Sequence, residues 1–192
     1  MDAATTPSSI PLPPAHPLVS RADEVFARTS PYEGRGFVHH CRRLFSFTAM
    51  LMEHRGVGFD PALAYFIAMV HDLGLVSERD QGINYLHRSL ALFRRETAGL
   101  TVPEPDPEVV EQCLLYNHRV LPVPGLSDAA ECFRNAVMIE HSRGRLRFGL
   151  PRDRVAPVFD RYPREDFDRV LLDFTWRTLS REPLTLVRGI FF

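Results

Sequence analysis

Lysine is absent from this sequence, so all 23 of its basic residues are arginine. The absence excludes a Schiff-base lysine, a lysine general base and a Walker-type phosphate loop, because each depends on a lysine amine. The basic residues also form no dense run, and the net charge is only −1. Since a polyanion partner would need a local basic patch, we expect no nucleic-acid partner.

Cysteine is scarce as well. The three cysteines, Cys41, Cys113 and Cys132, are odd in number and widely spaced in apolar surroundings, which is typical of buried, reduced thiols. A cytoplasmic protein is therefore expected. No apolar run approaches membrane-spanning length, and the first 20 residues lack the basic start and apolar stretch of a signal peptide. We expect no membrane partner.

The chain has enough apolar material for one domain. Hydrophobic residues make up 45% of its 192 residues and charged residues 24%, which is ordinary for a globular protein. Repeated prolines predict an extended N-terminal arm over residues 1–16. Residues 17–192 are expected to form a single domain.

Apolar residues recur at steps of three and four along most of this domain, which is the period of amphipathic helices. The pattern predicts helices over residues 17–28, 35–53, 61–72, 82–95, 108–118, 128–143 and 166–179. No alternating pattern of useful length predicts a strand. The expected fold class is therefore all-α, a helical bundle.

The segment 61–72 raises the main question about function. Nine apolar residues, 62–70, follow one another and predict a central helix that is buried on all sides. His71 and Asp72 end it, and Gly74 is expected to stop it in a left-handed conformation. Two ionisable groups at the inner end of such a helix would be costly without partners.

The surroundings of the His-Asp pair point to a metal site. His40 lies 31 residues before His71 on a helix expected to pack against it, and further histidines and glutamates lie on later helices. Neutral imidazole and carboxylate are suitable ligands for a divalent cation such as zinc, iron or manganese. Metal binding would also compensate the buried charge of the aspartate.

This arrangement resembles the HD superfamily of metal-dependent hydrolases, which has a histidine, a later His-Asp pair and an aspartate on a late helix of a helical bundle. The resemblance covers roughly residues 34–150. The stretches "HHCRRLFSF", "GFDPALAYFIAMVHDLGL" and "RLRFGLPR" are most similar to the cyanamide-hydratase-like branch, whose first motif is Asn-His-x-x-Arg. The resemblance implies that His40, His71 and Asp72 are metal ligands. It implies that Arg43 is the motif arginine, with His39 in place of the asparagine.

The sequence departs from the family at the late aspartate. When the family's late helix is laid over "FRNAVMIEHSRGRLRFGL", the aspartate position falls on Val137, which cannot bind metal. Glu140 and His141 follow at steps of three and four, so either could reach the same helix face. We take Glu140 as the substitute ligand and His141 as the competing choice. Leu75 stands where related branches carry a second-metal histidine, so one ion is expected rather than two.

The resemblance implies a hydrolase or hydratase that uses a metal-activated water on a small molecule. A phosphoester or nucleotide and a nitrile-like group are both open as substrates. Asp72 is expected to orient the water, and Arg43, His39, His118 and His87 are the candidate substrate-binding residues. Two alternatives remain: a diiron oxygenase of the same superfamily, and a degenerate binding module without catalysis.

The C-terminal sequence "LTLVRGIFF", residues 184–192, is apolar enough to pack on a second copy of the chain or back onto its own core. We therefore expect either a homo-oligomer that is formed through this segment or packing of the segment onto the core of its own chain.

Overall fold

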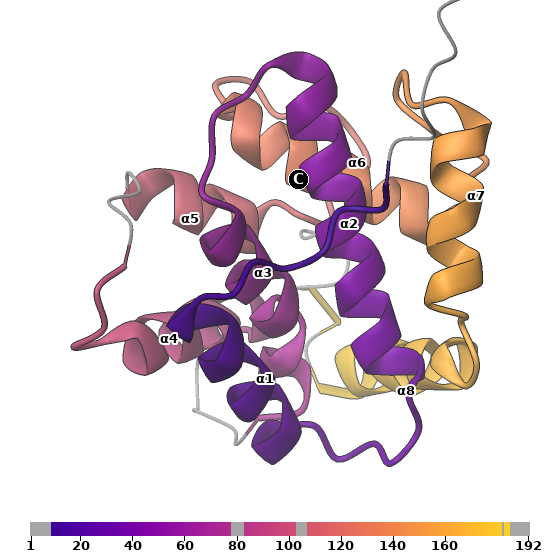
Figure 1. Ribbon diagram of the computed structural model, residues 1–192. Helices are drawn as coiled ribbons and strands as arrows, with labels where there is room; N and C mark the ends of the chain where they lie inside the picture. Colours follow the sequence, from indigo (N-terminus) through magenta and orange to yellow (C-terminus); the bar gives the residue numbers. More distant parts are fainter. Residues whose placement is uncertain (1–8, 78–82, 103–106, 182, 185–192) are drawn as a thin grey trace, which may run out of the picture.

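The central helix predicted from the apolar run is α3 (Pro61–Val70), and every residue from Ala62 to Val70 is buried. Asp60 starts it, because its Oδ1 accepts a hydrogen bond from the backbone N–H of Leu63 at 2.8 Å. In Figure 1, α3 lies to the left of the long helix α2 (Gly36–Arg55) and above α1 (Pro17–Thr29). Both helices pack extensively on it.

This computed structural model describes residues 9–77, 83–102, 107–181 and 183–184 of the chain. Within these residues the protein is one compact all-helical domain with no strand, as the sequence predicts. After α3 come the 3₁₀ turn η1 (Leu73–Leu75), α4 (Tyr85–Thr97), α5 (Pro107–Leu115), α6 (Asp128–His141), α7 (Arg152–Arg161) and α8 (Phe167–Arg181).

Helix α2 crosses the front of the molecule, with α3 and α5 on one side of it and α7 on the other (Figure 1). It packs most extensively on α6 and α3, and it also contacts α7 and α8. It continues two residues beyond the predicted end at Glu53, because Gly56 adopts a left-handed conformation with φ 67° and closes the helix there. The N-terminal residues of α2 and the turn η1 that follows α3 contact α8 at one end of the bundle.

Gly74 has a different role from the one predicted. It does not adopt a positive φ but lies within η1, where the chain passes very close to α4. A Cβ atom at this position would lie 2.0 Å from the carbonyl oxygen of Tyr85. The backbone N–H of Gly74 donates to Ser89 Oγ at 3.0 Å. Glycine is needed here for close packing rather than for a left-handed turn.

Helix α5 ends at Leu115, three residues before the predicted end at His118. The reason is a side-chain contact: Asn117 Nδ2 donates to the carbonyl oxygen of Leu114 at 3.1 Å and satisfies a terminal acceptor of the helix. Asn117 and His118 therefore lie in the turn that follows α5. This turn reaches the end of the bundle where α3 also ends.

The predicted arm is described from residue 9 onward, and it does not stand apart from the domain. Ile10 packs against the core, and Ser46 Oγ on α2 donates to the carbonyl oxygen of Pro11 at 3.2 Å. His16 then caps α1. Residues 1–8, the start of the helix predicted at Gly82, and residues 185–192 of the apolar C-terminal sequence lie outside the described residues.

Candidate metal site and the adjoining cavity

Three predicted ligands converge where α2 passes the end of α3. His40 belongs to α2, His71 follows the last residue of α3, and Asp72 comes next in the chain. The Nε2 atoms of the two histidines are 3.2 Å apart. Asp72 Oδ2 lies 3.1 Å from His71 Nε2 and 3.8 Å from His40 Nε2. We call these three residues the histidine–aspartate cluster, and all of them are buried.

The other ring nitrogen of His71 determines which tautomer is present. His71 Nδ1 lies 2.8 Å from the carbonyl oxygen of Ala68. Because a carbonyl can only accept, this nitrogen carries the proton. His40 Nδ1 lies 3.1 Å from Glu140 Oε2, but the two atoms are not in hydrogen-bond geometry and neither has a hydrogen-bond partner. The protonation of His40 is therefore decided at its Nε2, which faces the lone pair of His71 Nε2.

At 3.2 Å the two Nε2 atoms need a proton or a cation between them. Burial is the largest influence on His71 and lowers its pKa, but the carboxylate of Asp72 and its hydrogen bonds outweigh it, so the net pKa is raised. Burial lowers the pKa of His40. Burial opposes the charged form of Asp72, yet His71 and His118 hold its pKa well below the usual range. A single proton shared by the two Nε2 atoms can therefore occupy the position that a metal cation would take.

Glu140 lies behind His40, on the side away from the cluster. Its Oε2 faces His40 Nδ1, while its Oε1 accepts from Arg43 Nη2 at 2.6 Å and from Arg164 Nη1 at 2.7 Å. Glu140 thus lies on the side of the ring from which a carboxylate can orient a metal-binding histidine. A second group of side chains has metal-ligand spacing and consists of His40, Glu140 and His141.

Arg43 is wholly buried and is not brought to the cavity described below. Its Nε and Nη2 donate to Glu140, and its Nη1 donates to the carbonyl oxygens of Tyr162 and Pro163 at 2.7 and 3.1 Å. The guanidinium therefore ties α2, α6 and the segment after α7 together. Phe167, at the start of α8, stacks on the His40 ring with centroids 4.2 Å apart and restricts its orientation.

A cavity of about 430 Å³ opens beside the cluster. Asp72 reaches its wall, together with His118, whose Nε2 lies 2.9 Å from Asp72 Oδ1. His141 also lines it and keeps 33% of its side-chain surface exposed. Val137, at the predicted position of the family's aspartate, forms part of the same wall. The structure thus brings His118 and His141 to the cavity.

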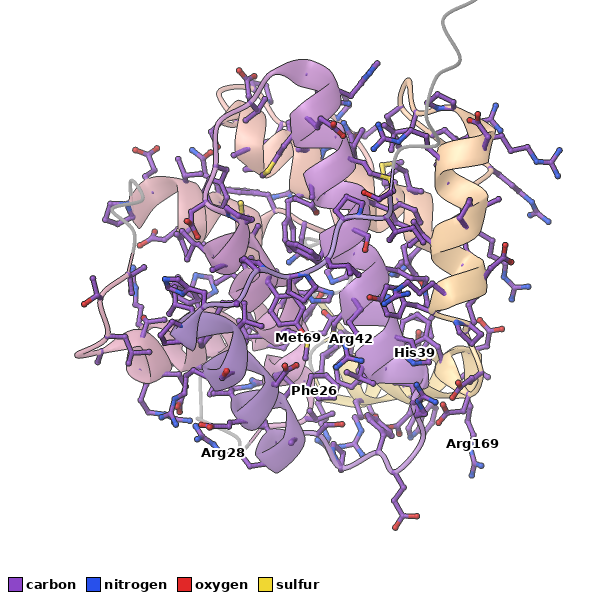
Figure 2. All side chains as sticks on the ribbon, viewed as in Figure 1. Phe26, Arg28, His39, Arg42, Met69 and Arg169 are labelled. Atoms are coloured by element: carbon purple, nitrogen blue, oxygen red, sulfur yellow. The ribbon has the colours of Figure 1, made fainter. Side chains whose placement is uncertain are left out.

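Two other predicted residues lie elsewhere. His39 is buried at the start of α2, with Nδ1 3.0 Å from the carbonyl oxygen of Pro163 and its ring beside Tyr162. Figure 2 shows it toward α8. His87 is exposed at the start of α4, with its Nδ1 2.8 Å from Asn84 Oδ1. Neither lines the cavity.

Two residues of the site escaped the sequence reasoning. Asn117 is buried in the cavity wall, and its Oδ1 has no hydrogen-bond partner. Arg164 supplies the second guanidinium to Glu140. Asn117 directly precedes His118 in "YNHR". Two adjacent polar residues at the end of a helix were therefore the sequence feature that could have indicated Asn117 as part of the site. Arg164 carried none, because its partner is 24 residues away.

A scan against protein-family models and a search of curated proteins found no match to this chain. The likeness to the HD superfamily therefore stays a prediction from the motifs. Among the described residues, no helix combines the length and the apolar character needed to cross a membrane.

Proposed function

We propose that this chain is a metal-dependent enzyme that adds water to a small molecule, a hydrolase or hydratase of the HD type with motifs most like the cyanamide-hydratase-like branch. The observation that supports the proposal best is the convergence of His40 Nε2, His71 Nε2 and Asp72 Oδ2 on one point. Three potential ligand atoms converge there next to a cavity of substrate size.

The donor set fits one divalent ion. His40 Nε2, His71 Nε2 and Asp72 Oδ2 would hold it, and two imidazoles with one carboxylate suit zinc, iron or manganese. Glu140 would orient His40. This role takes the place of the predicted one, in which Glu140 itself binds the metal. His141 lines the cavity and remains the candidate for a further ligand from α6.

An ion held this way would lower the pKa of a coordinated water and polarise the substrate. The protein's own groups have three tasks around it. Asp72 can orient a water in the cavity, since its carboxylate lies at the cavity wall and can accept a hydrogen bond there. His118 holds Oδ1 of that carboxylate in place. The apolar side chains of the wall exclude other water from the reaction.

Elemental analysis of protein purified without chelator tests the proposal. We expect about one zinc, iron or manganese ion per chain, and loss of that ion in Asp72→Ala and in His71→Ala. His87→Ala is the matched control, because its ring is exposed and distant from the cavity, and it should keep the ion. Retention in all three variants would refute the site. Two irons per chain would instead support a diiron oxygenase.

A second candidate function is a binding module without catalysis. Val137 supports it, because the cavity wall at this position offers no carboxylate ligand. This alternative predicts that the purified protein holds no metal and gains no thermal stability when zinc, iron or manganese is added.

A further inference from the structure

His118 controls how the Asp72 carboxylate faces the histidine–aspartate cluster. Its Nε2 donates to Asp72 Oδ1 at 2.9 Å, because a carboxylate oxygen can only accept. This contact leaves Asp72 Oδ2 turned toward the two histidines of the cluster. Carboxylates that bind metal are usually held by such hydrogen bonds. A displaced His118 ring would let the carboxylate rotate, and the three potential ligand atoms would no longer converge.

The backbone that carries His118 has little packing of its own. His118 lies in the turn after α5, and residues 120–122, which follow it, are exposed. Before His118 the turn is tied to α5, because Asn117 Nδ2 donates to the carbonyl oxygen of Leu114 at 3.1 Å. After His118 the turn needs a second attachment, since exposed residues gain too little from packing to hold one conformation.

Arg134, in the middle of α6, supplies that attachment. Its Nη1 donates to the carbonyl oxygens of Arg119 and Val120, the two residues directly after His118, at 2.8 and 3.1 Å. Its Nε and Nη2 donate to the two carboxylate oxygens of Glu131, one turn earlier on α6, both at 2.7 Å. Arg134 is only 3% exposed. The bidentate pair with Glu131 fixes the direction of the guanidinium, and the remaining nitrogen binds the turn.

Building on the proposed function, we propose that Arg134 is a positioning residue of the metal site. It acts through the backbone of residues 119 and 120 on His118, and through His118 on Asp72. Arg134 is not among the residues that line the cavity, so it touches neither the proposed ion nor a substrate. Its effect on metal binding must therefore pass through the turn.

Zinc affinity, measured by competition with a chromogenic chelator, tests this route. Mutation of a residue that orients a metal ligand usually lowers the affinity about 10- to 100-fold. Because Arg134 acts one contact further away, Arg134→Met should weaken zinc binding by about tenfold. Arg134→Lys keeps a charged donor and should recover part of the loss. Val158→Ala, a buried position on α7 away from the cavity, controls for lowered stability and should bind zinc like the wild type.

A double-mutant cycle shows whether Arg134 acts through His118. His118→Ala removes the donor to Asp72. If Arg134 has no other route to the ion, adding Arg134→Met to His118→Ala should weaken zinc binding further by no more than about twofold. Additive losses would overturn the inference, and so would equal losses in Arg134→Met and Val158→Ala.

A measurement without metal separates this inference from the proposed function. In metal-free protein with ¹⁵N-labelled histidine, the Nε2–H of His118 should give a slowly exchanging NMR signal, assigned by its loss in His118→Ala. Arg134→Met should speed its exchange with water by about tenfold or more, because the turn opens more often. The Nδ1–H of His71, which donates to the carbonyl oxygen of Ala68, is the internal control and should not change.

The two measurements fail independently. An unchanged His118 signal in Arg134→Met would overturn the inference even if the wild-type protein binds zinc tightly. Absence of zinc binding by the wild type would refute the proposed function, and the His118 signal alone would then decide whether Arg134 holds the ring.

Discussion

Replacing Arg43 with methionine would remove the central cation of a buried ion-pair network. Arg43 and Glu140 are both fully buried, and two guanidinium nitrogens of Arg43 lie 3.0 and 2.6 Å from Glu140 Oε1. Methionine approximates the aliphatic part of arginine but supplies no donor. The substitution would leave the Glu140 carboxylate, together with the carbonyl oxygens of Tyr162 and Pro163, short of partners.

Removing one partner of a buried ion pair usually costs about 3 to 5 kcal/mol of folding free energy. Arg164 still donates to Glu140 at 2.7 Å, so we expect the lower end of this range, about 3 kcal/mol. For a chain of this size each kcal/mol lowers the midpoint of thermal unfolding by about 2 to 4 °C. The expected decrease is therefore about 6 to 12 °C.

Urea unfolding followed by far-ultraviolet circular dichroism measures the effect. Arg177→Met is the matched control, because Arg177 pairs with Asp173 on α8 and both side chains are about one third exposed. That pair should contribute less than about 1 kcal/mol. If the two variants lose equal stability, the structural role assigned to Arg43 is wrong. A substrate-binding role would then become the better explanation.

Three further predictions concern α3 and its surroundings. Gly74→Ala should destabilise the protein strongly in urea unfolding, because the new Cβ would overlap a backbone carbonyl of α4, whereas Gly58→Ala, with open space around it, should be nearly neutral or slightly stabilising. In metal-free protein, the raised pKa of His71 means that its stabilising contribution is complete below its ordinary pKa of 6.5 and is lost as the pH rises through the higher folded value. Measured unfolding free energies should therefore depend less on pH across this window in His71→Gln, and an unchanged profile would contradict the assigned protonation. Asp60→Ala should cost about 1 kcal/mol by loss of the N-cap of α3, and chemical unfolding would detect it.

Local sequence signals were sufficient to predict most of the fold. The nine apolar residues 62–70 predicted the burial of α3, and the three- and four-residue period of apolar residues predicted most of the helices around it. Gly74 was misread because its function depends on how closely α4 approaches, which no local pattern encodes.

The site was predictable only in part. His40, His71 and Asp72 were predicted as ligands from their resemblance to the HD motif, and the structure brings them within ligand distance of one another. Glu140 was predicted as a metal ligand, and in the structure its Oε2 lies 3.1 Å from His40 Nδ1. Its position behind the ring depends on two arginines from other segments, one of them 97 residues away, and helical periodicity cannot report such contacts.

The burial of the histidine–aspartate cluster has a consequence for laboratory evolution. Its three polar side chains are buried beside the end of the most apolar helix. Well-packed hydrophobic residues at such buried positions often stabilise a protein more than charged groups do. Selection for heat resistance alone would therefore favour replacement of these three residues early. A thermostabilised descendant that has kept all three would show that something other than stability had been selected at this position.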